Sequence, residues 1–185
     1  ALLLAAAALG LPLGAAAQVP QYGPNVNLEQ ARKLLAGAEA EARKIAVPMA
    51  IAIVDNAGQL VAFLRMDNTQ TGSIGVAQDK ASSAALYRRP TKVFQDVLAA
   101  GGAGLRVLTL RGANAVEGGV PIVVDGKIVG GIGVSGAASA QQDEELAIAG
   151  ASGLVDVVPS RNAPTAFIGH DEVAAAFAKG KPLLE

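Results

Sequence analysis

Apolar positions recur at helical spacing in the first part of the chain, between Asn27 and about Ala46, and predict an amphipathic helix there. These positions are Leu28, Ala31, Leu34, Leu35, Ala38, Ala42 and Ile45. Asn27, with Gln30 three residues later, is typical of a capping box at the start of a helix. Pro48 then prevents the helix from continuing.

Two stretches of different periodicity predict β-hairpins. Residues 49–54 are a short apolar run, and after a turn that ends at Gly58, residues 59–65 return as a second strand. Residues 120–134 form the clearer hairpin, because an Asp-Gly pair in its middle favours a type I′ turn.

Small residues at helical spacing predict a helix over residues 71–87, and Pro90 separates it from a shorter helix over residues 91–100. Residues 107–115 are ambiguous between strand and loop. Helices and hairpins therefore alternate along this part of the chain.

The last third predicts two more helices. Ser139 with Gln142 repeats the capping-box pattern and opens a helix to about Val155, and a final helix covers residues 171–179. Hairpins interleaved with helices indicate an antiparallel sheet with helices packed on it, an α/β domain of the α+β kind.

The first residues differ from the rest in being almost wholly apolar. Residues 1–17 are an apolar run that ends in three alanines, an A-x-A cleavage pattern typical of an export signal. The run is shorter than the roughly 20 apolar residues that span a membrane, so we expect no stable span once it is removed. We therefore expect a periplasmic or extracellular protein, with a lead-in at residues 18–26 and a single domain over residues 27–185.

Composition narrows the function classes. The chain has 185 residues, which suits one domain, and its net charge of −1 lacks the basic footprint of a nucleic-acid partner. It has no cysteine, which excludes disulfides, thiolate metal sites and thiol catalysis within it. Aromatic residues are only 3 % and glycine is abundant, so we expect a core of small aliphatic residues with closely packed backbones.

A glycine-rich stretch imitates a dinucleotide-binding fingerprint. Residues 131–136 match G-x-G-x-x-G, but the strand before them is the second arm of a hairpin, and the helix begins later, at Ser139. We favour the interpretation that Gly131 and Gly133 let a helix or a subunit approach the sheet closely. A glycine strand of this kind can also form the floor of a ligand pocket.

Several short motifs occur in a distinctive order over residues 27–154. They are Val54-Asp55-x-x-Gly58, Phe63-x-Arg65-Met66-Asp67, Ala77-x-x-Lys80-Ala81, Pro90-Thr91, Gly118-Gly119-Val120-Pro121-Ile122, Gly130-Gly131-Ile132-Gly133-Val134-Ser135-Gly136 and Gln142-Asp143-Glu144. In this order the chain resembles the GlcG/HbpS-like family, also called haem-binding, PduO C-terminal-like or DUF336 domains. The resemblance implies a profilin-like fold of α/β/α layers around a central antiparallel sheet, and a homo-oligomer built from dimers. It also implies haem as a cofactor, since several members bind haem.

Few residues could ligate a haem iron, which usually takes His, Met, Cys or Tyr. His170 is the only histidine, although a lone histidine near a helix start is more often a surface residue. Met66, Tyr22 and Tyr87 are weaker candidates. The family pattern places Thr91 beside the presumed pocket as a ligand contact, and a hydroxyl would hold iron only weakly; the alternative for Thr91 is an N-cap.

Two cations are candidates for an anionic ligand such as a propionate. Lys80 lies among alanines on a helix face, so it either faces an anion or extends its ammonium to the helix edge. Arg65 could act similarly, with pairing to Asp67 as the alternative. Asp143 and Glu144 suit the positive end of a helix dipole, which explains them without a ligand.

These observations leave three functions open. The first is an exported protein that binds or handles haem. The second is an enzyme or enzyme accessory for a small anionic metabolite, a hydroxy acid or a corrinoid-related compound. The third is a structural oligomer or partner-binding subunit. No nucleophile–base–acid set emerges, so the enzyme is the less favoured interpretation.

Overall fold

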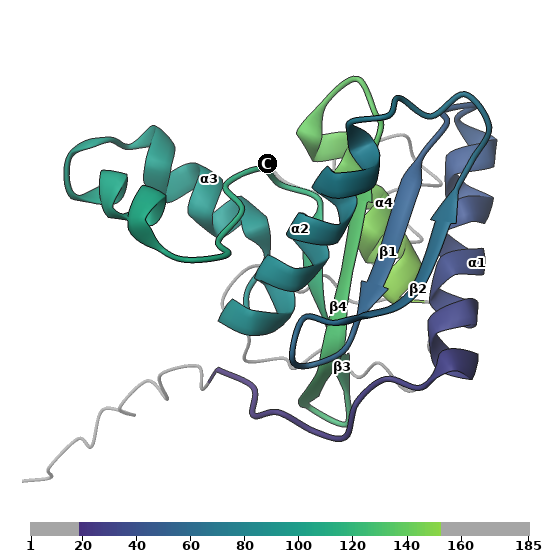
Figure 1. The fold of residues 1–185 in the computed structure, drawn as a ribbon, viewed down its shortest axis with the longest axis horizontal. Coiled ribbons are helices and arrows are strands. Elements are labelled where there is room, and N and C mark those ends of the chain that lie inside the picture. The colour runs from purple at the N-terminus through teal and green to yellow at the C-terminus, as the bar shows by residue number, and fades with distance from the viewer. Residues whose placement is uncertain (1–18, 153–185) are drawn as a thin grey trace, which may run out of the picture.

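The computed structural model describes residues 19–152 (Figure 1). The predicted export segment, the predicted helix at residues 171–179 and His170 lie outside the described residues. In chain order the elements are α1 (Leu28–Lys44), β1 (Ala50–Val54), β2 (Leu60–Arg65), α2 (Ser73–Tyr87), α3 (Thr91–Ala99), the 3-10 helix η1 (Gly102–Thr109), β3 (Gly119–Val124), β4 (Lys127–Ser135) and α4 (Ala140–Ala151).

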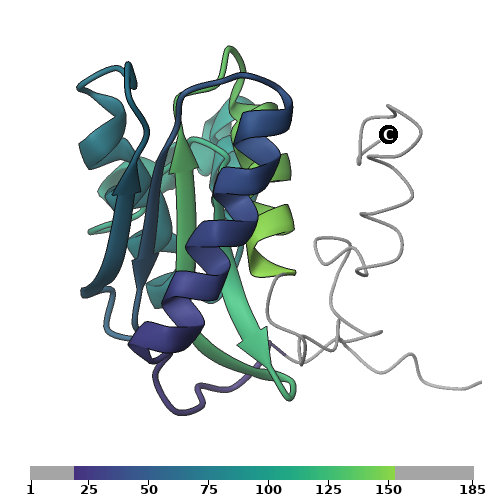
Figure 2. The ribbon, with the colours of Figure 1, turned by 90° about the vertical axis from the view of Figure 1, so that its right-hand side faces the viewer.

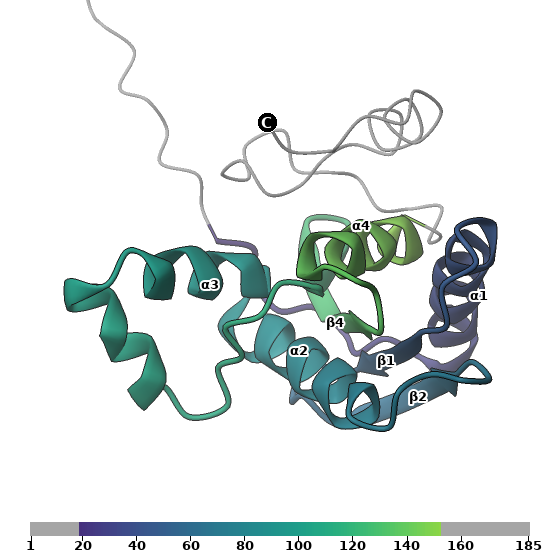
Figure 3. The same ribbon diagram turned by 90° about the horizontal axis from the view of Figure 1, so that it is seen from above.

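The strands form one antiparallel sheet in the order β2-β1-β4-β3, with helices on both faces. Helices α1 and α4 pack side by side on one face, and α2 covers the other (Figures 2 and 3). The predicted antiparallel α/β/α layers are confirmed.

Alternation along the strands divides the core in two. On β1, Ile51 and Ile53 pack with α1 and α4, whereas Ala50 and Ala52 face the alanines of α2. Because side chains on a strand alternate between faces, a strand of uniformly buried residues serves both layers at once.

The local signals read from the sequence hold in the structure. Asn27 and Gln30 form a reciprocal capping box, and the Ser139 hydroxyl accepts a hydrogen bond from the Gln142 amide. Asp125 and Gly126 have φ values of 49° and 71°, as a type I′ turn requires. Residues 102–109 form the 3-10 helix, so the strand alternative for residues 107–115 is wrong.

The glycines of β4 serve helix packing. A Cβ on Gly131 or Gly133 would clash with the α2 backbone, at the carbonyls of Ala81 and Ala77 respectively. The close approach of a helix is confirmed. A contact of Gly131 or Gly133 with a ligand stays a prediction.

Residues 91–118, here called the arm, project from the layered body (Figures 1 and 3). The arm contains α3 and η1, and η1 packs mainly on α3. Its exposed apolar side chains are Leu105, Leu108, Leu110 and Val116. No helix within residues 19–152 is long and apolar enough to cross a membrane.

Candidate functional site

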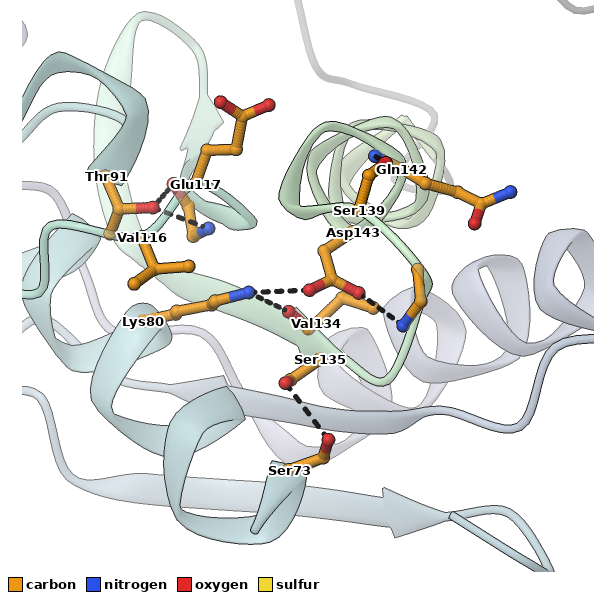
Figure 4. A network of polar contacts seen from close by, with 12 residues as sticks. Ser73, Lys80, Thr91, Val116, Glu117, Val134, Ser135, Ser139, Gln142 and Asp143 are labelled. Atoms are coloured by element: carbon orange, nitrogen blue, oxygen red, sulfur yellow. Dashed lines mark hydrogen bonds and ion pairs between the residues drawn. The ribbon is translucent and has the colours of Figure 1, made fainter. Parts of the chain in front are cut away.

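A buried ion pair lies where α2, β4 and α4 meet. Lys80 Nζ lies 2.7 Å from Asp143 Oδ2 and donates a second hydrogen bond, of 3.0 Å, to the Val134 carbonyl (Figure 4). The other carboxylate oxygen of Asp143 accepts the Ala137 amide at 2.9 Å. The pair therefore ties the middle of α2 to the start of α4.

This geometry corrects the sequence-based view of both residues. The Lys80 side chain is only 1 % exposed, so it does not extend to the helix edge. Its charge is balanced by Asp143 within the domain, and a contact of Lys80 with a ligand stays a prediction. Asp143 lies in the first turn of α4, as the dipole argument expected, but it also neutralises Lys80.

The ion pair is sealed by the glycines that lead into β3. Gly118 has a φ of 117°, and a Cβ there would lie 2.8 Å from Lys80 Nζ and 2.8 Å from Asp143 Cβ. The next residue, Gly119, lies against the backbone of α2 at Lys80. Only glycines allow the chain to pass this close to the pair.

Thr91 is held at the base of the arm. Its Oγ1 accepts the Gly119 amide at 2.9 Å, and the residue is 0 % exposed (Figure 4). The N-cap of α3 is Pro90, and Thr91 is the first helical residue, so the N-cap interpretation of Thr91 is wrong. Thr91 is buried in this arrangement, and its contact with a ligand stays a prediction.

A second buried carboxylate group lies beside Thr91. Gln95 Nε2 donates to Glu117 Oε2 at 2.6 Å, and Gln95 Oε1 accepts the Glu117 amide at 3.0 Å. Glu144, on α4, is 4 % exposed, and its Oε2 has no hydrogen-bond partner among the described residues. Burial first, and then the charge of Glu117, raise the pKa of Glu144 to about 7.

The other predicted site residues lie apart from this cluster. Arg65, at the exposed end of β2, donates to the Thr69 carbonyl at 3.4 Å rather than pairing with Asp67. Met66 is half-buried and packs against the main core.

Of the usual iron ligands, the described residues contain only methionine and tyrosine. They contain neither histidine nor cysteine. The Tyr22 hydroxyl donates to the Ala85 carbonyl at 3.0 Å, and the Tyr87 hydroxyl donates to the Arg111 carbonyl at 2.7 Å. Within residues 19–152 no three histidine or acidic side chains come together as a metal site. His170 lies outside this range.

The sequence did not single out Gln95 or Glu117, and it explained Glu144 by the helix dipole alone. One sequence pattern could have indicated Glu117. It precedes two glycines at the start of a strand, and such glycines indicate that the chain passes close to its neighbours. The cluster as a whole joins α2, the arm, β4 and α4, and its one unpartnered group is a carboxyl that can hold a proton near neutral pH.

Comparison with known proteins gives consistent results. A family model described as "Haem degrading protein HbpS-like" matches residues 26–152. Protein GlcG of Escherichia coli K12 is 38 % identical over 107 residues, which are 58 % of this chain and 78 % of GlcG.

Solved structures agree with the sequence matches. A double mutant of Streptomyces reticuli HbpS is 32 % identical, with a TM-score of 0.66 over 82 % of this chain and 99 % of that one. A PduOC–haem complex is 26 % identical, with a TM-score of 0.64 over 71 % of this chain and 96 % of that one.

Proposed function

Because the chain belongs to the HbpS-like family, whose model matches residues 26–152, we propose that it binds or handles haem, held non-covalently in an oligomeric α/β domain. The observation that carries this proposal is the similarity of most of the described fold to a relative whose structure contains haem.

Part of the surface suits an amphiphilic macrocycle. Leu86 and Leu110 are exposed apolar residues at the end of α2 and on the returning part of the arm. These segments are adjacent, because the Tyr87 hydroxyl donates to the Arg111 carbonyl. The Arg111 side chain is exposed, and a guanidinium there suits a carboxylate such as a propionate.

The strength with which the iron is held depends on its ligand. The candidates for its ligand are Thr91, which requires the base of the arm to open, and His170, which lies outside the described residues. A hydroxyl is a poor iron ligand, so a contact through Thr91 gives labile haem, which suits sensing or scavenging rather than storage.

We further propose that the protein is exported to the periplasm or the extracellular space and works as a homo-oligomer built from dimers. The apolar residues 1–17 with their A-x-A ending support export. The four exposed apolar side chains on the arm support oligomers, because a group of exposed apolar side chains is typical of an interaction surface. Intact-mass analysis of the secreted form should find an N-terminus near Gln18.

The anionic-metabolite alternative receives no support from the described residues. Lys80 and Arg65, its two candidate contacts, already have partners within the domain. The test of the haem proposal is a haemin titration of the full chain followed by absorbance, with Thr91 and His170 variants.

A further inference from the structure

Two buried carboxyl groups at the base of the arm lack a cation of their own. Glu117 is 5 % exposed and Glu144 is 4 % exposed, and neither takes part in an ion pair among the described residues. Glu117 is bonded to Gln95, whereas Oε2 of Glu144 has no partner. Burying a charge without a partner is costly, so this region favours a proton on Glu144.

The charges around Glu144 come from three other elements. The charge of Glu117 acts on it from the segment before β3, whose next residue, Gly118, lies against Asp143. Lys92 and Asp96 act on it from α3, and Lys80 acts on it from α2. Both lysines are engaged elsewhere: Lys80 with Asp143, and Lys92 with both carboxylate oxygens of Asp96 at 2.8 Å. On α4 itself, Asp143 and Glu145 flank Glu144. No free cation among these groups compensates a second negative charge.

The same place anchors the arm to the body. Thr91, the first residue of α3, accepts the Gly119 amide at the start of β3, and Gln95 bonds to Glu117, which closes the base of the arm on itself. Since η1 packs mainly on α3, these contacts hold much of the arm. A repulsion between Glu117 and Glu144 acts directly across this attachment.

We propose that Glu144 and Glu117 form a proton-controlled latch, in which a proton on Glu144 keeps the arm closed and loss of that proton loosens it. The raised pKa of Glu144, about 7, places the change near neutral pH. Two adjacent buried carboxylates repel each other and gain hydration when the interface opens. The arm is therefore closed in mild acid and held more loosely in mild alkali.

Opening of the arm has a consequence for Thr91. The Thr91 side chain is buried, and its hydroxyl accepts the Gly119 amide. Opening of the arm would break this bond and expose the hydroxyl. The link from the latch to haem access rests on the proposed function, whereas the latch itself does not. An experiment on the ligand-free chain therefore separates the two.

The absence of cysteine from the whole sequence allows site-specific spin labels. We would introduce Ala103→Cys in η1 and Lys33→Cys on α1, both at exposed positions, and measure the distance between the labels by pulsed electron paramagnetic resonance. Dilution with unlabelled chain restricts the measurement to distances within one chain. Spectra are compared at about pH 5.5 and about pH 8.5 in otherwise wild-type protein, in Glu144→Gln and in the control Asp67→Asn, at an exposed position after β2.

We expect one narrow distance at pH 5.5 and an added broad or longer population at pH 8.5, with a midpoint near pH 7. Glu144→Gln should keep the narrow distance at both pH values, and Asp67→Asn should behave as the wild type does. If Glu144→Gln does not fold, Glu117→Gln should suppress the high-pH population instead, because it removes the facing charge. Identical distances at both pH values in the wild type, or a shift that persists in a folded Glu144→Gln or Glu117→Gln variant, would overturn the latch.

Discussion

The ammonium of Lys80 lies 2.7 Å from Asp143, and both side chains are buried. The two residues are 63 positions apart in the sequence and belong to helices on opposite faces of the sheet. The end of β4 lies between them, since the Val134 carbonyl accepts a second bond from Lys80. A single charged contact therefore joins both helical layers at the end of the sheet where the arm begins.

Replacing Lys80 with methionine should strongly destabilise the fold. The change leaves the Asp143 carboxylate buried without its cation, and breaking a buried pair from one side costs about 3–5 kcal/mol. Adding Asp143→Asn removes the second charge and keeps an oxygen for the Ala137 amide, so the double variant should recover most of the loss. Urea unfolding of the three proteins measures these differences.

Lys92→Met is the matched control for this experiment. Lys92 pairs with Asp96 near the surface, where such pairs contribute only about 0–1 kcal/mol. If Lys80→Met is no more destabilising than Lys92→Met, the buried pair does not have the structural role assigned to it.

Glu144 should make stability depend on pH in an unusual direction for an acid. Its pKa is about 7 in the folded chain against an ordinary 4.5, so the native state holds the proton more tightly than the unfolded state. The contribution of Glu144 to stability is fully present below about pH 4.5 and falls as pH rises through about 7, by roughly 3 kcal/mol in total.

Urea unfolding across this pH range tests the direction. Glu144→Gln should flatten the decline relative to the wild type, because the amide cannot ionise. Glu29→Gln, at an exposed position on α1, should leave the decline unchanged. Parallel curves for the wild type and Glu144→Gln would contradict the assignment.

Two glycine substitutions should have opposite effects. In Gly133→Ala the new methyl group meets the Ala77 carbonyl of α2, and such overpacking costs about 1–3 kcal/mol. Gly75, in α2, has open space at its Cβ position, so Gly75→Ala should stabilise the helix by roughly 0.5–1 kcal/mol. Thermal unfolding of both variants is the measurement, and a neutral Gly133→Ala would show that α2 is not held against β4.

The arm should matter for assembly. Leu108 is 72 % exposed on the arm, and Leu108→Glu should weaken the oligomer, since a carboxylate would have to be buried on association. Leu60→Glu, at a similarly exposed apolar position on β2, is the control. Light scattering after size-exclusion chromatography gives the mass of each. Equal masses for wild type and Leu108→Glu would argue against the arm as an interface.

The sequence predicted those features whose cause is local. The capping box at Asn27, the turn at Asp125 and Gly126, and the short apolar run of β1 each depend on neighbours within a few positions. The glycines of β4 could also be interpreted, because a glycine inside an apolar strand points to close packing.

The environment of the site residues could not be predicted, because it depends on distant segments. Lys80 stood among alanines with Asp79 beside it in sequence, yet its partner comes from the start of α4, 63 positions away. Glu144 suited a helix start, whereas its burial and the lack of a partner for its Oε2 depend on segments that lie far from it in the sequence. Thr91 suited an N-cap in the sequence, but in the structure it is the first helical residue and its hydroxyl accepts the Gly119 amide.

The haem proposal is tested most directly by titrating the full-length, ligand-free chain with haemin at micromolar concentrations. We expect a saturable Soret band. The band should be weaker in Thr91→Ala if Thr91 contacts the iron, and weaker in His170→Ala if His170 does. Thr91→Ser keeps the hydroxyl bonded to Gly119 and serves as the control for a change in folding. No spectral change on adding haemin to folded wild-type protein would contradict the proposed function.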